Sequence, residues 1–576
     1  MAIQDKFNRA NVIYKITKDI DLGGETLTIP EGCTLDFQGG SFSNGSIVGN
    51  NTAIKATLTK IFGLDVELIG SWNIAEAYPE WFDAKGDGII DDAKSINLCI
   101  STFSDKDTII YLTGKYAVTN INVSKNCNIQ GTLSASLLHI GDGICMNVAP
   151  PDNITSWHQF IRTKICNLKI QLNSKSKIGL RINQCVGSIF EKIFITGSNL
   201  SVPTLEDSEH PETFTSPSSI GVFIDGTSNV EPNNNSVFNN IFHRIVSNKV
   251  DIGFDFNGII SDSKFYNIES NTVGYGVRIN SKSSYNLTFE DCQFVDTNIG
   301  FCFNDCLVSS FVKGCNIEMY RYYGIYKQEY PNNSILNIVS NGLTTKHNTK
   351  KADIFIKSVT CSQISNNIVG WGAPSGTSEE QLSPEQKSDI IGNPNSCLIY
   401  GNRAQNGKLV VYSTAINNSN FIMSYKWINN NNYSHIAGNT HLEHFATSDF
   451  DLFNESNVLK IKLKGSKYVS FRKENGIELF LPTGASNTDM SIVKDAEVGT
   501  LIYRTDLKVP IWRTPDWQWR EIDGCLPGVP RVGRYQDRPT AEYYKISAGF
   551  CYFDVNNNKP IWWTGSKWVD ATGAEV

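Results

Sequence analysis

A short pattern of alternating apolar and polar residues, each copy beginning with glycine, recurs through the middle of the chain. The last four of its six copies start 23, 24 and 24 residues apart. A second pattern, a large apolar residue followed three positions later by Ile or Cys, runs in phase with the first. The glycine pattern begins at Gly179, Gly221, Gly253, Gly276, Gly300 and Gly324, and the second at Phe190, Phe242, Phe265, Phe289 and Val312.

Coils of about 23 residues, with short alternating strands and Asn- or Gly-rich turns, are typical of a parallel β-helix. Leucine-rich repeats have a similar length, but their LxxLxLxxN pattern is absent from the sequence. One coil cannot bury its own apolar face, whereas a stack of coils can. We therefore predict an all-β chain built on a single-stranded right-handed parallel β-helix, with a small capping helix and C-terminal β modules.

The register of the coils predicts which side chains share a column. Two interior ladders are expected, one of Phe254, Val277, Phe301 and Ile325, the other of Phe190, Phe242, Phe265 and Phe289. The residue after each member of the second ladder points outward, which predicts a surface column of Glu191, His243, Tyr266, Glu290 and Lys313. Neighbouring coils should lie about 4.8 Å apart, the spacing of paired strands.

One coil, the one that contains His243, departs from the regular length. It carries an insertion of about 20 residues near Gly197–Ser218 and another of about nine near Gly226–Ser236. Long loops on a rigid scaffold commonly carry function, so this coil is a candidate location for a site.

The segments before the regular coils have their own patterns. Residues 20–60 alternate between apolar and polar positions around several glycines, which predicts short β strands leading into the helix. Residues 91–103 predict an α-helix, with Asp91 as N-cap and Asp92 favourable in the first turn. Its apolar stripe consists of Ile96, Cys99, Ile100 and Phe103.

A different repeat closes the chain. The segment that begins at Gly499 returns at Gly549, and its Pro-Ile-Trp ends at Trp512 and again at Trp562. We interpret the two copies as small β-hairpin modules. Aromatic faces stack on sugar rings, so glycan-binding candidates here are Trp512, Trp562, Trp563 and Trp568. Buried tryptophans of a small β module would give the same composition.

Composition narrows the possible functions. The net charge of −7 argues against a nucleic-acid groove, which needs a concentrated basic face. The 14 cysteines form no CxxC pair, which disfavours a disulfide scaffold or a zinc site and favours reduced, buried thiols. No apolar run is long enough for a transmembrane helix, and Met1–Ala10 lacks the apolar region of a secretory signal.

Residues 79–96, PEWFDAKGDGIIDDAKSI, closely resemble the PEWFGAKGDGxTDDxxAI opening of pectate-lyase-like β-helix proteins, above all bacteriophage tail spikes. Asp83 stands where that pattern has glycine, and Ile90 where it has threonine. The segment Ile29–Gly45 and the terminal KPIWW…WVDATG resemble tail proteins of phages that infect gut Bacteroidetes, including crAss-like phages.

The resemblance implies a homotrimer in the virion tail, made in the host cytoplasm and acting at the host cell surface. Its expected partners are bacterial surface polysaccharide and other tail proteins, with no cofactor, metal, nucleic acid or membrane insertion. The GDGIIDD stretch is expected to shape a turn and cap the helix rather than to catalyse. Four parts are expected: a virion-attachment region at 1–75, the β-helix at 76–410, a trimerisation or connecting domain at 411–485, and the Trp-rich modules at 486–576.

Cleavage of a polysaccharide by hydrolysis needs two carboxyl groups, whereas elimination needs a base and a group that neutralises the sugar carboxylate. Glu269 and Glu290 should lie on the order of 8–11 Å apart, near the roughly 6.5–9.5 Å of inverting glycosidases. His243 and Glu191 complete the catalytic candidates, and Tyr266 is a candidate sugar contact. Any solvated β-helix face would show similar residues. Asp255 and Arg278 are predicted to form a surface ion pair.

Two functions therefore remain open. One is a tail spike that recognises and depolymerises capsular polysaccharide, as a hydrolase or a lyase. The other is a non-catalytic receptor-binding or structural tail protein that uses the β-helix as a rigid rod. A bacterial polysaccharide lyase is a third, disfavoured by the missing signal peptide.

Overall fold

The computed structural model describes two compact units of the chain, residues 1–467 and 468–576, which are treated separately below. The described residues are 3–105, 107–152, 154, 156–205, 217–227, 235–280, 284–304, 307–328, 335–345, 347, 350–360, 363–371, 389–395, 398–400, 402–404, 409–413, 435–437, 442–446, 450–455, 458–463, 501–504, 509–513, 515, 519–521, 530–544 and 546–576.

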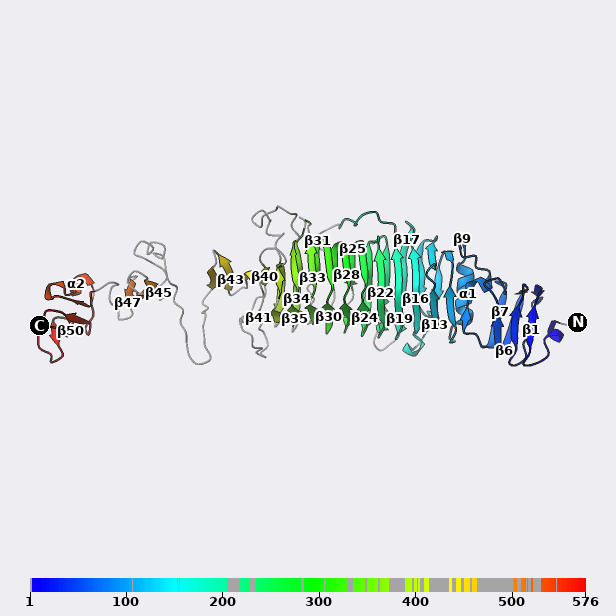
Figure 1. The fold of residues 1–576 in the computed structure, drawn as a ribbon, viewed down its shortest axis with the longest axis horizontal. Helices are drawn as coiled ribbons and strands as arrows, with labels where there is room; N and C mark the ends of the chain where they lie inside the picture. Colours follow the sequence, from blue (N-terminus) through cyan, green and yellow to red (C-terminus); the bar gives the residue numbers. More distant parts are fainter. Residues whose placement is uncertain are drawn as a thin grey trace. The chain divides into compact units, whose positions relative to one another are not determined.

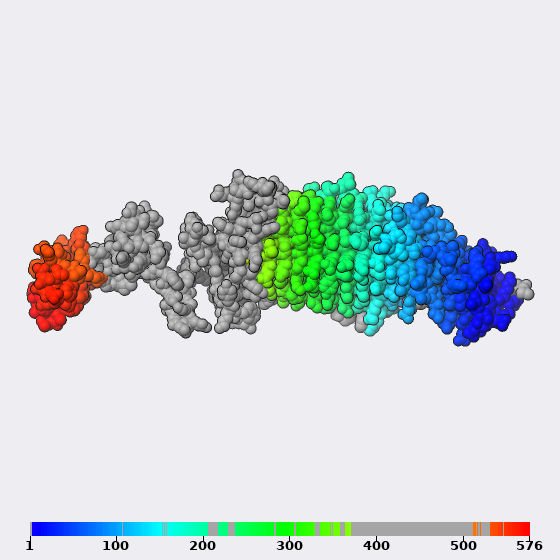
Figure 2. Space-filling model, in the orientation of Figure 1, coloured from blue at the N-terminus to red at the C-terminus, as the bar shows by residue number. Residues whose placement is uncertain are grey.

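Parallel pairing between successive coils dominates the first unit (Figure 1). Each strand pairs with the equivalent strand about one coil later, so the chain winds as a parallel β-helix, as the repeat predicts. Within the main sheet, antiparallel pairing joins β42 (Leu442–Ala446), β43 (Phe450–Glu455) and β44 (Val458–Leu463). The described coils form one continuous surface from the blue residues to the green ones in Figure 2.

The coils supply two series of strands that matter for the site. The first series runs through β15 (Gly143–Val148), β17 (Ser176–Asn183), β20 (Ile220–Gly226), β23 (Ile252–Ser261), β25 (Glu269–Asn280), β28 (Gln293–Phe303), β31 (Asn316–Lys327) and β34 (Ala352–Thr360). The second runs through β13 (Cys127–Gly131), β16 (Thr163–Gln171), β19 (Ile189–Thr196), β22 (Ile241–Asn248), β24 (Lys264–Tyr266), β27 (Thr288–Glu290), β30 (Ser310–Lys313), β32 (Leu336–Val339) and β35 (Gln363–Ser365).

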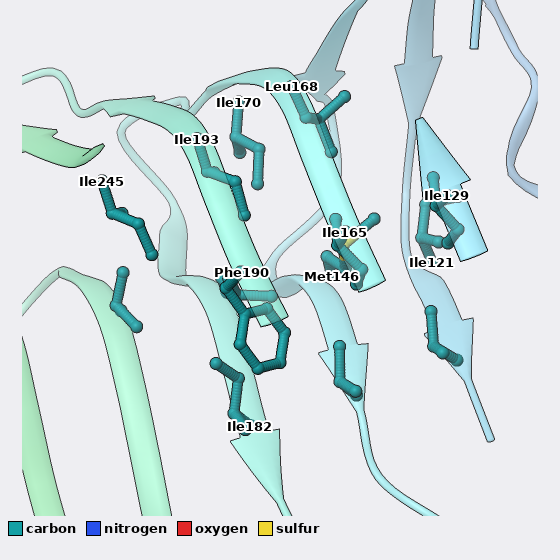
Figure 3. Close-up of a cluster of buried hydrophobic side chains, with 14 of the residues drawn as sticks. Ile121, Ile129, Met146, Ile165, Leu168, Ile170, Ile182, Phe190, Ile193 and Ile245 are labelled. Atoms are coloured by element: carbon teal, nitrogen blue, oxygen red, sulfur yellow. The ribbon is translucent and has the colours of Figure 1, made fainter. Parts of the chain in front are cut away.

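Both interior ladders are confirmed. The register aligns Phe254 with Val277, Phe301 and Ile325, and all four side chains are fully buried. The rings of Phe190, Phe242, Phe265 and Phe289 stack at centroid distances of 5.1, 4.6 and 4.8 Å. Figure 3 shows Phe190 among Ile165, Ile182 and Ile193, side chains from different strands that meet in the interior.

The glycine that opens each repeat is required by close packing across the interior. A Cβ atom at Gly276 would lie 2.7 Å from two ring carbons of Phe294. At Gly300 it would lie 2.5 Å from Ile317. Real Cβ atoms do not approach other heavy atoms so closely, so these positions exclude larger residues.

Each coil bends after the second-series strand at a residue in the left-handed region. Asn267, with φ of 50°, separates β24 from β25. The same bend is made in other coils by Asn167, Lys192, Arg244, Asp291, Gly314, Ser340 and Asn366. The side chain after the bend is interior, and toward the C-terminal coils it becomes an asparagine ladder in which Asn341 Nδ2 donates to Asn367 Oδ1 at 3.0 Å.

The cysteines behave as small buried apolar residues. All ten in the described part of the chain are free thiols, nine of them buried, and Cys551 is exposed. Burial raises the pKa of the Cys127 thiol to about 11 and that of Cys145 to about 12. These two thiols are therefore protonated and unreactive at neutral pH.

The N-terminal strands also pair in parallel and lead into the helix. β1 (Ile13–Ile16), β4 (Thr34–Phe37) and β6 (Gly45–Lys55) align in one column, and β3 (Thr26–Thr28), β6 and β7 (Val66–Trp72) in another. β2 (Ile20–Asp21) pairs with β5 (Phe42–Ser43). One apolar core runs without interruption from Phe7 to Val369.

The PEWF motif and the helix after it form the junction between these strands and the regular coils. The helix α1 spans Ala93–Phe103 and buries Ile96, Cys99, Ile100 and Phe103, as predicted. Trp81 and Phe82 of the short 3-10 turn η2 (Pro79–Phe82) pack on Phe103 at centroid distances of 6.2 and 6.1 Å.

The predicted N-cap is wrong by one residue. Asp92 occupies the N-cap position, while the Asp91 carboxylate accepts a hydrogen bond from the Ala93 amide at 3.0 Å. The Asp92 carboxylate instead accepts from the amides of Lys85 and Gly86, at 2.7 and 2.9 Å. Asp83 has φ of 73°, a left-handed conformation that explains why glycine suits this position in the pattern it resembles. The GDGIIDD stretch therefore has a structural role here.

The longer insertion is held against the helix by one carboxylate, that of Asp251. It accepts hydrogen bonds from Asn199 Nδ2 at 2.8 Å, from the Ser218 amide and hydroxyl at 2.5 and 2.6 Å, and from the Ser219 amide at 3.3 Å. Asp251 is buried. We call residues 199–205 the strap. Its Pro203 carbonyl accepts from Asn298 Nδ2 at 2.6 Å, so the strap reaches across several coils.

Replacing Asp251 by alanine is expected to release the strap and to lower the free energy of unfolding by about 2–3 kcal/mol, because several hydrogen bonds to a buried carboxylate are lost together. Limited proteolysis should then cut first within the strap, residues 199–205. Asp142→Ala, which removes an exposed carboxylate elsewhere on the same unit, is the control and should change neither measurement. Identical digestion patterns for wild type and Asp251→Ala would contradict this role.

The ion pair between Asp255 and Arg278 exists, but the prediction that it lies on the surface is wrong. Arg278 donates from Nε and Nη2 to the two carboxylate oxygens at 2.9 and 2.8 Å, and both residues are buried. An apolar cluster lies outside the helix interior on the same strands, formed by Ile252, Tyr275, Ile299, Tyr323 and their neighbours, and Leu205 of the strap packs into it. This outer layer removes the pair from solvent.

The second unit contains two small sheets whose hairpins have the same register. One sheet consists of β45 (Leu501–Arg504), β46 (Val509–Arg513) and β47 (Trp519–Glu521). The other consists of β48 (Val532–Gly533), β49 (Cys551–Asp554), β50 (Lys559–Trp563) and β51 (Trp568–Asp570), with β48 parallel to β49. Leu501 pairs with Trp512 as Cys551 pairs with Trp562. The predicted hairpins are present, each extended by a third antiparallel strand. η8 (Tyr535–Asp537) and α2 (Ala541–Tyr544) lie between β48 and β49.

The four-part division of the chain stays a prediction. Its boundary near residue 485 lies outside the described residues, as does much of the segment 411–485 assigned to trimerisation or connection.

Candidate functional site

The outward column expected from the repeat is present. The register aligns Glu191 with His243, then Tyr266, Glu290 and Lys313. A second outward column runs beside it, across the left-handed bend, and consists of Phe194, Val246, Glu269, Gln293 and Asn316. We call these two columns together the two-column face. Because strands hold both columns, the spacing of their side chains is set by the backbone.

Glu191 and His243 are in contact at one end of this face. Glu191 Oε1 lies 3.5 Å from His243 Nδ1 and 3.3 Å from Lys192 Nζ. Partial burial raises the pKa of Glu191, but the hydrogen bonds and charges of Lys192 and His243 outweigh it and hold the pKa below its usual value. Glu191 is therefore ionised at neutral pH, which suits an acceptor or a base and not a general acid.

Glu290 forms an ion pair along the column. Its Oε1 lies 2.7 Å from Lys313 Nζ, and this hydrogen bond raises the pKa of Lys313. This contact engages one oxygen of the Glu290 carboxylate.

Glu269 is exposed and lies on the second column, so its neighbours in the register are Val246 and Gln293. The bend at Asn267 separates it from the column of Glu290, and the Asn267 amide donates to the Glu290 carbonyl at 3.0 Å. The fold thus brings Glu269 and Glu290 onto adjacent coils, on the two sides of a bend. That Glu269 and Glu290 act as a catalytic acid–base pair stays a prediction.

Two exposed apolar side chains on this surface were not singled out from the sequence. Phe194 is 46% exposed, and Ile241, two residues before His243, is 39% exposed. Both point outward from strands whose inward residues are also apolar, so their apolar character alone did not distinguish them from the core. Alternation could have found Ile241, which lies two residues before the outward His243. Phe194 follows Glu191 by three residues, across the bend at Lys192, and could have been found from its register with Val246 and Glu269.

The four C-terminal tryptophans divide between two faces. Trp563 and Trp568 pack against the core of Ile546, Phe550, Tyr552 and Ile561, so these two belong to the buried-module interpretation. Trp562 alternates with Trp563 and lies on the opposite face, paired with Cys551 and Val569. Trp512 has the equivalent position in the first module, beside the fully buried Ile511. A glycan-binding role for any of the four stays a prediction.

Over the part of the chain that the structure describes, no three His, Cys, Asp or Glu side chains come together in the manner of a metal site. Within the same residues, no helix has the length and apolar character needed to cross a membrane.

Comparison with known proteins gives structural likeness without a sequence family. No family model matches the chain, and none of the curated proteins does. The chain is similar to the gp42 tailspike of Acinetobacter phage vb_AbaP_AS12, with 11% identity, a TM-score of 0.42, and coverage of 77% of this chain and 75% of that one. It is also similar to tailspike protein 3 of bacteriophage CBA120, with 11% identity, a TM-score of 0.37, and coverage of 87% and 69%.

A third similar structure is the Streptococcus pneumoniae surface protein and adhesin PfbA, with 11% identity, a TM-score of 0.38, and coverage of 65% of this chain and 99% of that one. At these scores the likenesses carry no argument about this chain. The β-helix is established by its own strand pairing.

Proposed function

We propose that this chain is a bacteriophage tail spike whose β-helix recognises bacterial surface polysaccharide along the two-column face. The observation that carries the proposal is the register of that face. Hydrogen-bonding side chains of several kinds (carboxylate, imidazole, phenol, amide and ammonium) follow one another coil by coil, with the exposed ring of Phe194 beside them.

The geometry suits an extended ligand. Five consecutive coils place the column from Glu191 to Lys313 over about 19 Å, four intervals of the roughly 4.8 Å strand spacing. A row of that length can contact several sugar units in series. Sugar rings present hydroxyl groups at their edges and C–H groups on their faces, so a surface of polar side chains with an occasional ring matches them.

The sequence supports the tail assignment. The PEWF…DGIIDD segment resembles the opening of phage tail spikes, and here it forms the junction between the N-terminal strands and the regular coils. A place in the virion tail of a phage of gut Bacteroidetes, crAss-like phages included, and assembly as a homotrimer with other tail proteins belong to the same proposal.

Recognition without cleavage is the form that the local chemistry favours. Contacts with Lys192 and His243 lower the pKa of Glu191, so this carboxyl group is not set up as a proton donor, and Glu290 is engaged in an ion pair with Lys313. A depolymerase remains the alternative, with Glu269 or Glu290 as acid and His243 or Glu191 as base.

Tyr266→Ala is expected to weaken binding to the cognate capsular polysaccharide about tenfold, since a half-buried aromatic contact contributes roughly 1–1.5 kcal/mol. Binding would be measured by biolayer interferometry against capsular polysaccharides from a panel of gut Bacteroidetes strains. Tyr285→Ala removes a comparably exposed tyrosine on a different strand, β26 (Ser284–Tyr285), and should leave affinity unchanged. Equal effects of the two substitutions would contradict the assignment of the face.

The same polysaccharides decide between recognition and cleavage. Intact chain length after long incubation would confirm a non-catalytic spike. Shortened chains without the ultraviolet absorbance of unsaturated uronates would identify a hydrolase, and Glu269→Gln and Glu290→Gln should then abolish the shortening. Shortened chains with that absorbance would identify a lyase and exclude the two-carboxylate pair.

A further inference from the structure

Exposed cations gather at the N-terminal end of the two-column face. Lys164 and Lys169 lie on β16, in register with Ile189 and Phe194 of β19. Lys192 and Arg244 follow at the bends of β19 and β22. Across the residues of these three strands, the single carboxylate is Glu191, and its contacts are the cation Lys192 and His243. This basic end belongs to a chain whose net charge is −7.

Two of these cations, Lys192 and Arg244, occupy bends with an unfavourable backbone conformation for their residue types. Lys192 and Arg244 have φ of 54° and 55°, in the left-handed region. Asn167, Asn267 and Gly314 make the same bend in other coils, and these residue types tolerate that conformation better than Lys or Arg. Cations therefore occupy two bends where the local backbone favours other residues, which points to a use for their charge.

Charges of both signs follow further along the face. Glu269, Glu290 and Asp291 lie in the coils from Tyr266 onward, together with the cations Lys264 and Lys313. Phe194 lies between Lys169 and Val246 in its column, and Lys192 is two residues before it on β19, so two cations flank an exposed aromatic ring. An exposed ring flanked by cations fits a sugar ring that carries a negatively charged substituent.

We infer that the basic end of the two-column face selects acidic polysaccharide, binding carboxylates or sulfates of its sugars with Lys164, Lys169, Lys192 and Arg244 while Phe194 contacts a sugar ring. The inference rests on the proposed function, because it names the ligand class of the same face. Arg244 presents a planar fork that matches a carboxylate in two-point contact, and the lysines contribute point charges.

Salt-dependent retention on an acidic matrix tests the inference without knowledge of the natural ligand. The full chain would be applied to immobilised polygalacturonate, to dextran sulfate and to neutral dextran, and eluted with sodium chloride. Retention on an acidic matrix but not on dextran is expected, although the net charge of the protein is negative. Retention on polygalacturonate alone would identify carboxylate as the substituent bound, and retention on dextran sulfate alone would identify sulfate. Passage of the wild type through both acidic columns would overturn the inference.

Two double variants with the same change in net charge test whether acidic polysaccharide binds at the basic end of the face. Lys164→Glu with Arg244→Glu should weaken binding to the retained polysaccharide at least about tenfold, the loss expected for two exposed charge contacts made repulsive. Lys175→Glu with Lys177→Glu makes the same change in net charge at two exposed positions outside the face, one just before β17 and one on it, and should bind like wild type. Equal losses in both variants would mean that only overall charge matters and would also overturn the inference.

Capsular polysaccharide separates this inference from the proposed function. A capsule that binds, and still binds after its carboxyl groups are reduced and its sulfates removed, would retain the proposed function and refute acidic selectivity. Failure of every capsule to bind, together with retention on polygalacturonate, would refute the proposed function while the basic end still behaved as an acid-binding surface.

Discussion

Phe265→Ala is expected to lower the free energy of unfolding of the β-helix by about 3–5 kcal/mol, the range for a fully buried phenylalanine. The Phe265 ring is stacked between Phe242 and Phe289 at 4.6 and 4.8 Å, and its edge contacts Phe256 at 5.1 Å. Its removal opens a cavity in the middle of the stack. The surrounding coils cannot collapse into that cavity, because their spacing is held by parallel strand pairing on both sides.

The measurement is the denaturant midpoint of the first unit, followed by far-ultraviolet circular dichroism. Phe265→Leu keeps most of the volume and should cost less than Phe265→Ala. Phe311→Ala, on the outside of a neighbouring coil and 39% exposed, should change stability by less than about 0.5 kcal/mol. A Phe265→Ala midpoint equal to that of Phe311→Ala would disprove the stacked interior ladder.

Arg278→Met should destabilise the chain by about 3–5 kcal/mol, because it leaves the buried Asp255 carboxylate without its partner. Both side chains are less than a tenth exposed, and the two hydrogen bonds between them are short. The Tyr275 ring, 5.8 Å from the Arg278 guanidinium carbon, cannot supply a replacement donor of the same strength.

The double variant Asp255→Leu with Arg278→Met distinguishes pairing from packing. Replacement of both ions by apolar residues of similar size is often neutral or stabilising, so the double variant should recover most of the loss. Thermal unfolding of the two single variants and the double variant forms the cycle. A double variant no more stable than Arg278→Met alone would show that the residues act through shape and not through their charges.

The sequence was enough to predict which residues of the candidate surface share a column. It was not enough to predict which of their side chains form ion pairs. Counting residues from Phe190, Phe242, Phe265 and Phe289 placed Glu191, His243, Tyr266 and Glu290 in one column, and the strand pairing confirms it. Sequence spacing placed Lys192 next to Glu191 along the chain and Lys313 next to Glu290 in the column. It did not reveal that both ammonium groups turn toward the neighbouring carboxylates and form ion pairs with them.

The burial of Asp255 and Arg278 by the outer apolar cluster could not be predicted from the sequence either. Asp255 and Arg278 fall on outward positions, and an outward charged residue on a β-helix is ordinarily solvated. The insertion returns to the outer surface of the strands and, through the Asp251 anchor, brings Leu205 against Ile252, Tyr275 and Ile299. Nothing in the local pattern around Asp255 records that an apolar cluster forms on the same strands outside the helix interior.

The sequence by itself determined the repeat, the parallel β-helix, both interior ladders, the helix that follows the PEWF motif and the two C-terminal modules. These features follow from periodicity, because residues that recur at a fixed interval must stack when each coil buries its apolar face on the next. The tertiary structure alone decided which outward charges are paired, which are buried on the outer side of the coils, and which tryptophans face the module core. Those outcomes depend on contacts between segments that are far apart in the chain. Such contacts occur in one coil only, so the repeat does not predict them.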